Sequence, residues 1–480
     1  METIQLLPIL PEIFLAIWGM LILLFATGTS AQIANRAMVM TFVGLFIALG
    51  LQWEGIGHTD TLPLLKVDTF SRFVGGIVLI GGMGLSLIAR DFLTRHQYHR
   101  GEFYVLLIFC ILGIRTLIIA DSLLTLYVGL EMMSFCLYIL AAFMRENAKS
   151  SEAGLKYFVL GSLASGVLLY GMSLLYGLTG DISYTGVAAG ITSLIQAGEP
   201  LNPALIVAFV FILAGILFKL SVVPFHMWTP DVYEGAPTPV TAIMSTLPKL
   251  AAVALLMRVL LEPFATLQNV WQPTISLFAM LTMVGGSLLA IVQTNIKRLL
   301  AYSSIAQVGF LLVGIAAGTG TGFAGALFYT VTYIATLLGL FAVLLQLRKR
   351  AVDIENIGDF TGLGRTHPVL AGILLLCLFS LAGVPPLAGF FAKIYVFQAA
   401  MESGLLGLVI VGVLSSAVAV FYSLKLLKTI YFEKGEQQWD AAQPLQLRLV
   451  SITGAALTLG LFILPHPLWK LAMQAVQGWF

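Results

Sequence analysis

The sequence predicts an all-α polytopic protein that crosses a membrane many times. Charged residues make up 10% of its 480 residues and hydrophobic residues make up 59%, whereas soluble domains average roughly 25% charged residues. With a mean hydropathy of +0.97, the chain is too apolar for a soluble core to bury. The net charge of +2 does not indicate a nucleic-acid partner, so the partner that composition indicates is the lipid bilayer.

Fourteen apolar runs are long enough to cross a bilayer. A transmembrane helix needs about 20 mostly apolar residues, and such windows lie near residues 11–28, 37–54, 70–90, 103–119, 122–144, 154–177, 203–224, 238–261, 274–294, 298–317, 322–346, 368–398, 404–432 and 449–474. The least defined boundary follows Ala120, where Asp121 and Ser122 could cap a new helix. The first run lacks a signal peptide's basic segment and cleavage site, so we expect it to be the first spanning helix.

Basic residues in the connections predict the orientation. The odd-numbered connections carry Arg36, Arg90, Arg95, Arg100, Arg145, Lys149, Lys297, Arg298, Arg348, Lys349, Arg350, Arg365, Lys428, Lys434 and Arg448. The even-numbered connections carry almost none, with Lys66 the main exception. Because basic residues concentrate on the cytoplasmic side, we expect both termini on the opposite side. Arg258 is expected at the non-cytoplasmic interface. Arg115 is also predicted near the non-cytoplasmic side, contrary to the positive-inside rule, and the sequence does not explain it.

The stretch Leu217–Pro237, LFKLSVVPFHMWTPDVYEGAP, joins an apolar helix to a proline and ionisable side chains. Lys219 lies inside the apolar run, and Pro224 removes a backbone donor, so the helix must break or kink there. His226 and Asp231 follow, where we expect the chain to be still at membrane depth. Transporters build sites within the hydrocarbon from broken helices of this kind.

A second stretch, Leu378–Pro386, repeats this pattern. LFSLAGVPP matches LFKLSVVPF (217–225) at five of nine positions, and Pro385 and Pro386 break its helix. The two copies lie in predicted spans seven and twelve, five helices apart, so they must have opposite orientations in the membrane. Discontinuous helices in inverted repeats are typical of transporters.

Five ionisable residues lie inside predicted spans: Glu131, Lys156, Lys219, Lys249 and Lys393. Lys249 directly follows Pro248, where we expect a further helix break. Each of the five costs roughly 2.5–3.5 kcal/mol at a helix centre, so such residues favour a functional interpretation. A desolvated lysine can release its proton near neutral pH, whereas a nearby carboxylate such as Glu131 favours the charged form. The series predicts a proton relay, with Lys156 and His226 as secondary members.

Several of these residues also have a structural explanation. Glu131 and Lys219 could form a static buried ion pair, and Lys156 could pair with Glu152 one turn away. His226 could bond a carbonyl that the break exposes. Lys297 and Arg298 are expected to be topology anchors at the end of a span. Lys249 and Lys393 have apolar neighbours on both sides and too little reach for the interface.

No cofactor or metal site is evident in the chain. Cys110, Cys136 and Cys377 lie singly in apolar runs, so neither a disulfide framework nor an iron–sulfur ligand set is available. The Gly320-x-Gly322-x-x-Gly325 pattern follows a predicted membrane helix and lacks the strand that a nucleotide site needs. A sodium or calcium site would need several oxygen ligands, and one convincing carboxylate is present in the core.

Several long motifs resemble the antiporter-like subunits of respiratory complex I. These motifs are GLEMMS (130–135), LKYFVLGS (155–162), FKLSVVPFHMWTPDVYEGAPTPV (218–240), QTNIKRLLAYSSIAQVGF (293–310) and SLAGVPPLAGFFAKIYVF (380–397), and the resemblance covers essentially all 480 residues. It is closest to the subunit N branch in bacteria, which is subunit 2 in organelles. Lys393 stands where the subunit M branch carries a glutamate, and the chain ends without the lateral helix typical of the subunit L branch.

The resemblance implies two inverted five-helix repeats with broken helices seven and twelve. We therefore expect a three-helix segment at 1–100, repeats at 101–262 and 263–435, and a C-terminal helix at 436–480. The resemblance also implies a half-channel lysine at Lys219 with Glu131 as partner, a central lysine at Lys249 and an exit-side lysine at Lys393. Lys156 also falls on a lysine position of the family.

The function that the resemblance implies is proton translocation within an NADH–quinone oxidoreductase of the bacterial inner (plasma) membrane. NADH, FMN, iron–sulfur clusters and quinone would then be bound by other subunits, with no cofactor in this chain. The expected partners are a neighbouring antiporter-like subunit and small membrane subunits. Two alternatives remain open, a subunit of a cation/proton antiporter and a mainly structural membrane subunit.

Overall fold

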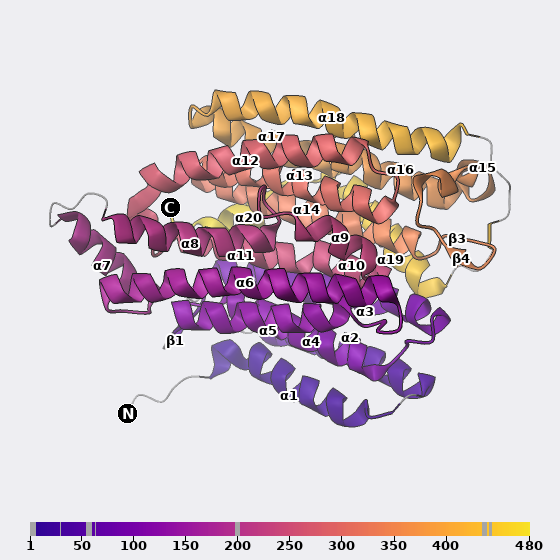
Figure 1. Ribbon diagram of the computed structural model, residues 1–480, viewed down its shortest axis with the longest axis horizontal. Coiled ribbons are helices and arrows are strands. Elements are labelled where there is room, and N and C mark those ends of the chain that lie inside the picture. The colour runs from indigo at the N-terminus through magenta and orange to yellow at the C-terminus, as the bar shows by residue number, and fades with distance from the viewer. Residues whose placement is uncertain are drawn as a thin grey trace.

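The chain folds into a bundle of long helices that run side by side (Figure 1). The computed structural model describes residues 6–28, 30–53, 60–62, 64–196, 202–433, 439–440 and 444–480. Lys434 and the predicted domain boundary at 435/436 lie outside these residues. α1 begins and α20 ends at the same end of the bundle, as an even number of spans requires.

The elements of the first half extend to the central helix pair. They are η1 (Leu7–Ile9), α1 (Leu10–Phe25), α2 (Ala31–Trp53), β1 (Asp60–Leu62), β2 (Leu65–Val67), α3 (Thr69–Arg95), α4 (Gly101–Ile118), α5 (Leu123–Ala141), α6 (Ala148–Thr179), α7 (Tyr184–Gln196), α8 (Pro203–Leu220), α9 (Trp228–Gly235), α10 (Thr238–Ser245) and α11 (Leu247–Leu261). β1 and β2 form an antiparallel hairpin with Asp60 opposite Val67.

The second half has the same helical character. Its elements are η2 (Ala265–Leu267), α12 (Gln268–Ile291), α13 (Ile296–Ala316), α14 (Gly320–Leu344), β3 (Arg348–Lys349), β4 (Val352–Asp353), η3 (Ile357–Phe360), α15 (Leu363–Thr366), α16 (Pro368–Ala382), α17 (Ala388–Glu402), α18 (Leu406–Tyr431), α19 (Leu445–Ile463) and α20 (His466–Val476). β3 and β4 are antiparallel, with Arg348 opposite Asp353.

The spans agree with the prediction except near their ends. Thirteen helices in the described residues are long and apolar enough to cross a membrane, and the shorter α16 joins α17 to make the predicted span 368–398. The span predicted at 449–474 is present but shorter, because α19 ends at Ile463 and α20 starts at His466. Pro465 and Pro467 interrupt the helix there, since proline lacks the backbone donor. α7 was not predicted.

Short polar side chains define several helix starts. Ser122 accepts a hydrogen bond from the Thr125 amide, which confirms a new helix after Ala120. Asp68 and Ser71 form a capping box at α3, and Asn147 caps α6. Asn295 caps α13 by accepting from two backbone amides. These caps satisfy donors that a helix cannot satisfy internally.

The two broken helices end in the same way, but one residue out of the predicted register. Ser221 follows α8 with φ 63°, and Gly383 follows α16 with φ 82°. In each case the next amide bonds back across the turn, from Val222 to the Leu217 oxygen at 3.0 Å and from Val384 to the Phe379 oxygen at 2.9 Å. The nine-residue alignment had placed Ser221 opposite Ala382. Matching identical residues placed the two helix ends out of register, because the helix ends at the residue with positive φ, whichever residue type stands there.

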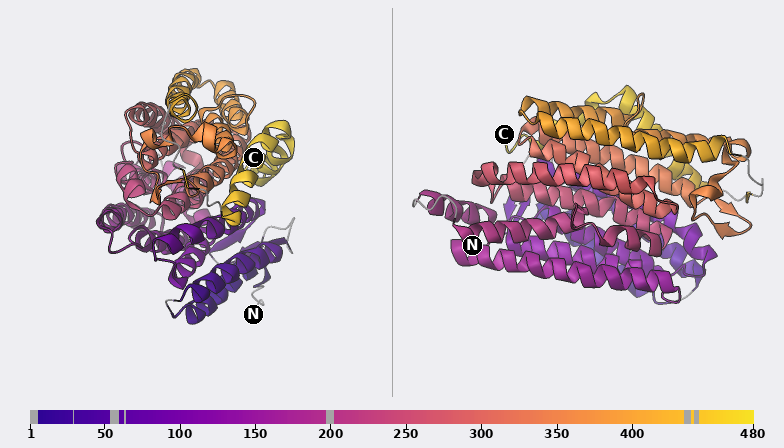
Figure 2. Two further views of the ribbon diagram at one scale, coloured as in Figure 1. Left: turned by 90° about the vertical axis from the view of Figure 1, so that its right-hand side faces the viewer. Right: turned by 45° about the horizontal axis from the view of Figure 1, so that its top comes forward.

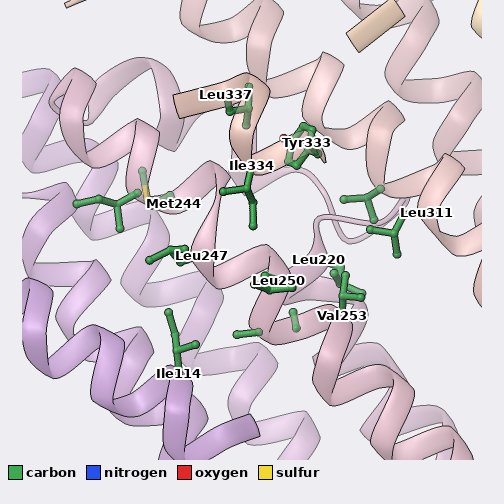
Figure 3. Packing of buried hydrophobic residues seen from close by; sticks show 14 of the residues in the cluster. Ile114, Leu220, Met244, Leu247, Leu250, Val253, Leu311, Tyr333, Ile334 and Leu337 are labelled. Atoms are coloured by element: carbon green, nitrogen blue, oxygen red, sulfur yellow. The ribbon is translucent and has the colours of Figure 1, made fainter. Parts of the chain in front are cut away.

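The centre of the bundle is the segment formed by α10 and α11, whose apolar window is entirely buried. Seen end-on, α1 and α2 lie at one edge and the second half of the chain lies on the opposite side (Figure 2). Close by, Leu247 lies between Ile334 of α14 and Ile114 of α4 (Figure 3). Apolar packing of this kind surrounds the buried lysines described next.

Candidate functional site

Lys219 is held by two hydroxyl groups of α5. Its Nζ lies 2.8 Å from the Ser134 Oγ and 3.2 Å from the Tyr138 hydroxyl, and the residue is 6% exposed. Ser134 in turn donates to the Leu130 oxygen at 2.6 Å. The aromatic rings of Tyr138 and Phe218 lie 5.5 and 5.9 Å from the ammonium group. These four groups, two hydroxyls and two aromatic rings, are neutral.

Glu131 lies one turn before Ser134 on α5 but makes no ion pair with Lys219. Its Oε1 is buried and has no hydrogen-bond partner among the described residues. The static ion pair, one of the alternatives from sequence, is therefore absent from this structure. An unpaired carboxyl close to a buried lysine can influence its charge without fixing its position.

The break after Lys219 exposes a carbonyl that Lys249 binds. α8 ends at Leu220, and the chain is irregular until Trp228 starts α9; the peptide bond before Pro224 is cis. Lys249 Nζ lies 3.0 Å from the Leu220 oxygen and 3.3 Å from the Ser221 Oγ. Lys249 is 3% exposed. Its ammonium group therefore donates a hydrogen bond to Leu220, the residue that directly follows Lys219.

Lys249 is positioned by a second interruption, at the junction of α10 and α11. Thr246 separates these helices with φ −116° and ψ −89°, and Pro248 lies in the first turn of α11. Proline is tolerated there because the first amides of a helix have no internal partner. Pro248 thus starts a helix instead of kinking one.

Lys393 repeats the arrangement in the second half. Its Nζ lies 2.8 Å from the oxygen of Ala382, the last residue of α16, and 3.0 Å from the Ser416 Oγ of α18. The Phe310 ring lies 4.1 Å away. Pro385 and Pro386 lie in the segment between α16 and α17, and the bond between them is cis. A cation is favoured at a helix C-terminus by the helix dipole, so each break provides a site for one lysine.

Uncharged polar side chains of α13 and α14 lie beside the Lys393 site. Gln307 donates to the Leu381 oxygen at 2.7 Å and accepts from the Tyr329 hydroxyl. Tyr333 donates to the Ser304 Oγ at 2.7 Å. Sequence reasoning missed these residues because hydroxyls and amides in an apolar run do not stand out as charges do. The only signal was that Ser304 and Gln307 belong to the motif at 293–310.

The two secondary relay candidates occupy different settings. Lys156 forms ion pairs with Glu152 at 2.8 Å and Asp231 at 2.9 Å and is 41% exposed, which confirms the pairing with Glu152. His226 is half-buried in the break, and its Nδ1 has no hydrogen-bond partner among the described residues. The structure does not bring Lys156 into hydrogen-bond contact with Lys219.

Lys297 and Arg298, expected as topology anchors, bind the segment after the first break. Lys297 is 7% exposed and donates to the Ala236 oxygen at 3.0 Å. Arg298 pairs with Asp231 at 2.7 Å and with Glu234 at 3.0 Å. The expectation was wrong for Lys297, because its long side chain reaches into the protein instead of toward the headgroups.

The basic exceptions to the orientation pattern are neutralised by carboxylates. Arg115 pairs with Glu12 of α1 at 2.5 Å, which explains a residue that the sequence left open. Arg258 is 1% exposed, not interfacial as expected, and pairs with Asp68 at 2.8 Å and Glu262 at 3.0 Å. Burial alone would raise the pKa of Asp68, but the Arg258 guanidinium lowers it below its usual value. Lys66 pairs with Glu262 at 2.9 Å.

Two cavities open near these groups. One of about 610 Å³ lies between α4, α5 and α6 and is lined by Arg100, Arg145 and Tyr138, among others. The other, of about 230 Å³, is lined by charged residues of α6, α9 and α13, including Asp231 and Arg298. The first cavity therefore reaches Tyr138, which is bonded to Lys219.

The three cysteines are free and buried. Among the residues that the structure describes, no group of three or more His, Cys, Asp or Glu side chains could hold a metal ion.

Comparison with known proteins places these features in context. Residues 120–419 match the transmembrane family of NADH:quinone oxidoreductases and Mrp antiporters. The NADH-quinone oxidoreductase subunit N of Paramagnetospirillum magneticum is 44% identical, with 100% of this chain and 99% of that protein covered. The corresponding protein of Rhodospirillum rubrum is also 44% identical, over 99% and 98% of the two chains.

Solved structures agree with these matches. A chain of respiratory complex I from Thermus thermophilus with bound Aureothin superposes with a TM-score of 0.81 at 32% identity, covering 97% of this chain and 100% of that one. A chain of the Mrp complex from Dietzia sp. superposes with a TM-score of 0.83 at 20% identity, over 98% and 96% of the two chains. The second likeness shows the fold alone.

Proposed function

The chain belongs to the transmembrane family of NADH:quinone oxidoreductase and Mrp antiporter subunits, and from this premise we propose a proton path through its buried lysines. It is a multi-pass, proton-translocating membrane subunit of an NADH–quinone oxidoreductase, a respiratory complex I. NADH, FMN, iron–sulfur clusters and quinone belong to other subunits of that complex.

The path begins at Lys219, continues through Lys249 and ends at Lys393. The observation that supports this path is the same contact at both helix breaks. Lys249 donates to the Leu220 oxygen at the first break, and Lys393 donates to the Ala382 oxygen at the second. A carbonyl accepts from an ammonium group and adds no charge of its own, so a lysine held in this way can release its proton without leaving a buried anion. Protons enter from the cytoplasm by the cavity that reaches Tyr138.

Glu131 sets the charge of Lys219 in this scheme. One oxygen of its carboxyl is buried, and Glu131 lies on the same helix as the two hydroxyls that hold the lysine. The carboxylate favours the ammonium form, and a change in their separation would load or unload the proton. Water and His226 serve the passage of the proton through Lys249 to Lys393. Moving one charge against 100 mV needs about 2.3 kcal/mol, which quinone reduction in other subunits supplies.

The proposal also includes the orientation of the chain in the membrane and the subunits next to it. Both termini lie on the non-cytoplasmic side, because the basic connections are the odd-numbered ones. The chain divides into a three-helix segment at 1–100, two inverted repeats at 101–262 and 263–435, and a C-terminal part at 436–480. Its neighbours in the membrane are another antiporter-like subunit and small membrane subunits.

Replacing Lys219 or Glu131 with alanine tests the path. We expect either variant to abolish or sharply reduce proton uptake by inverted membrane vesicles, measured against the rate of NADH-driven quinone reduction, with assembly intact. Lys425→Ala is the matched control, because Lys425 is an exposed lysine that donates to the Ile291 oxygen on the outer surface.

Three results would contradict this assignment. Full pumping by both variants would exclude the relay. Loss of assembled complex in both would favour a structural role for the buried charges. Sodium-dependent proton exchange by vesicles that lack quinone reduction would favour an antiporter.

A further inference from the structure

We propose that Arg298 of α13 is a positioning residue that couples the two halves of the proton path by holding α9. The inference rests on the proposed function, since it concerns how the Lys219 and Lys393 sites are linked. α9 is the helix that follows the first break, and α13 lies in the second repeat. No covalent bond joins them directly, so their relative position depends on side-chain contacts.

Two consecutive residues of α13 make three polar contacts, two with α9 and one with the residue that follows it. Arg298 Nη1 lies 2.7 Å from the Asp231 Oδ1 and 3.0 Å from the Glu234 Oε2. Lys297 donates to the Ala236 oxygen, which follows the last residue of α9, at 3.0 Å. Asn295 fixes both of these residues by accepting from their backbone amides at 2.8 and 3.2 Å. The capped start of α13 is therefore attached to α9 and the residue after it by three polar contacts.

Asp231 also binds α6, another helix of its own repeat. Lys156 of α6 lies 2.9 Å from its Oδ2, while Arg298 lies on its Oδ1. Burial alone would raise the pKa of Asp231, but Lys156 and Arg298 lower it below its usual value. The carboxylate is thus shared between a cation of each repeat, and α9 stands between them.

Aromatic contacts connect α9 to the Lys219 site. Trp228, one turn before Asp231, donates to the Phe218 oxygen at 3.0 Å, directly before Lys219. Its ring stacks on Tyr157 at 4.5 Å, and Tyr157 meets the Tyr138 ring edge-on at 4.7 Å. Tyr138 carries the hydroxyl that accepts from Lys219. A shift of α9 would therefore displace the groups that hold Lys219.

The middle of α13 reaches the Lys393 site through Gln307. Gln307 donates to the Leu381 oxygen, and the next carbonyl, that of Ala382, holds Lys393. Because α13 is one continuous helix from Ile296 to Ala316 and most of it is buried, it can transmit a displacement along its length.

Stability alone does not account for this cluster. The side chains of Arg298, Asp231 and Glu234 are 28–39% exposed to a cavity of about 230 Å³. Exposed ion pairs contribute little to folding, commonly less than about 1 kcal/mol. Six charged side chains from three helices nevertheless line this cavity, and five of them form ion pairs with one another. This arrangement is consistent with a role in positioning α9.

Arg298→Gln tests the proposal in the assembled complex. We expect the ratio of protons pumped to electrons transferred to fall by about two-fold or more, the lower end of the effect seen for residues that couple two sites, with NADH-driven quinone reduction retained. Arg298→Lys should restore most of the ratio. If Arg298 and Asp231 act through their contact, the double variant Arg298→Gln with Asp231→Asn should have a proton-to-electron ratio no lower than that of either single variant.

Lys149→Gln is the matched control, because Lys149 lines the same cavity but its carboxylate contact is Glu355, at 3.6 Å, and not α9. A wild-type ratio in the Arg298→Gln complex would overturn the proposal, as would strictly additive losses in the double variant. If Arg298→Gln lowers assembly, Asp231→Asn and Glu234→Gln test the same link from α9. Loss of assembly in all three would assign the cluster a structural role and also overturn it.

Lys219→Ala separates this proposal from the one on which it rests. Full pumping by Lys219→Ala would refute the proton path itself. Loss of pumping in Lys219→Ala together with a normal ratio in Arg298→Gln would refute only the coupling by Arg298.

Discussion

At the scale of single residues, buried lysines and buried arginines have different partners. Lys219, Lys249, Lys297 and Lys393 bond to hydroxyl or carbonyl oxygens, which carry no charge. The buried arginines, Arg115 and Arg258, pair with carboxylates. Arginine stays protonated in proteins, whereas lysine can release its proton when it is desolvated. The partner of each cation therefore distinguishes a fixed charge from one that can change.

The hydroxyl of Tyr138 provides a prediction at this scale. Tyr138→Phe keeps the ring but removes one of the two hydroxyls that hold Lys219. A hydrogen bond to a charged group contributes about 1.5–3 kcal/mol, so we expect slower proton uptake with the complex still assembled. Vesicle proton uptake measures this. Tyr170→Phe on the exposed face of α6 is the control, and an equal effect of both changes would contradict the role of Tyr138.

At the scale of elements, each broken helix ends in a residue with positive φ, and a lysine binds its last carbonyl. The first repeat uses Ser221 at this position, a serine whose Oγ also accepts from Thr229 at 2.7 Å. The second repeat uses Gly383, which leaves room for the Lys393 side chain. The left-handed conformation disfavours residues with a Cβ, and the hydrogen bonds of the Ser221 hydroxyl to Thr229 and Lys249 offset part of that cost.

Gly383→Ala tests the close approach at the second break. The new Cβ would lie 2.7 Å from the Lys393 Cδ, and the alanine would have to adopt a φ of 82°. We expect the variant to lose most proton uptake because Lys393 must move. Gly404→Ala is the matched control, since Gly404 has φ 76° but open space around a Cβ. Both changes introduce about 1–2 kcal/mol of backbone strain, so similar losses in the two would mean that strain, not Lys393, is responsible.

At the scale of the whole molecule, buried charge pairs join parts of the chain that are far apart in sequence. Arg115 of α4 pairs with Glu12 of α1 and also bonds to Gln52 of α2. Arg258 of α11 pairs with Asp68 before α3, and its guanidinium lies 5.8 Å from the ring of Trp479 near the C-terminus. These contacts attach the first helices and the last residues to the first repeat.

Removing one member of the Arg115–Glu12 pair should loosen the N-terminal helices. Arg115→Met leaves the Glu12 carboxylate uncompensated, and breaking a buried pair costs about 3–5 kcal/mol. We expect a lower thermal inactivation temperature of the purified complex. Replacing both partners, as Arg115→Met with Glu12→Leu, should restore most of the stability, because apolar pairs can substitute for buried ion pairs. A double variant as unstable as the single one would show that the pair is not what matters.

The sequence by itself determined the class of this protein, the approximate position of its spans and three of its buried lysines, Lys219, Lys249 and Lys393. Runs of apolar residues, the proline breaks and the lysines within them are local features, because hydrophobicity and missing backbone donors act through neighbouring residues. The partners of those charges were decided only by the tertiary structure. Ser134 and Tyr138 around Lys219, the carbonyls under Lys249 and Lys393, the inward turn of Lys297 and the pairing of Arg115 with Glu12 all depend on which helices lie side by side. An ammonium group in hydrocarbon must find an oxygen, but the spacing of residues along one helix does not reveal which neighbouring helix supplies it.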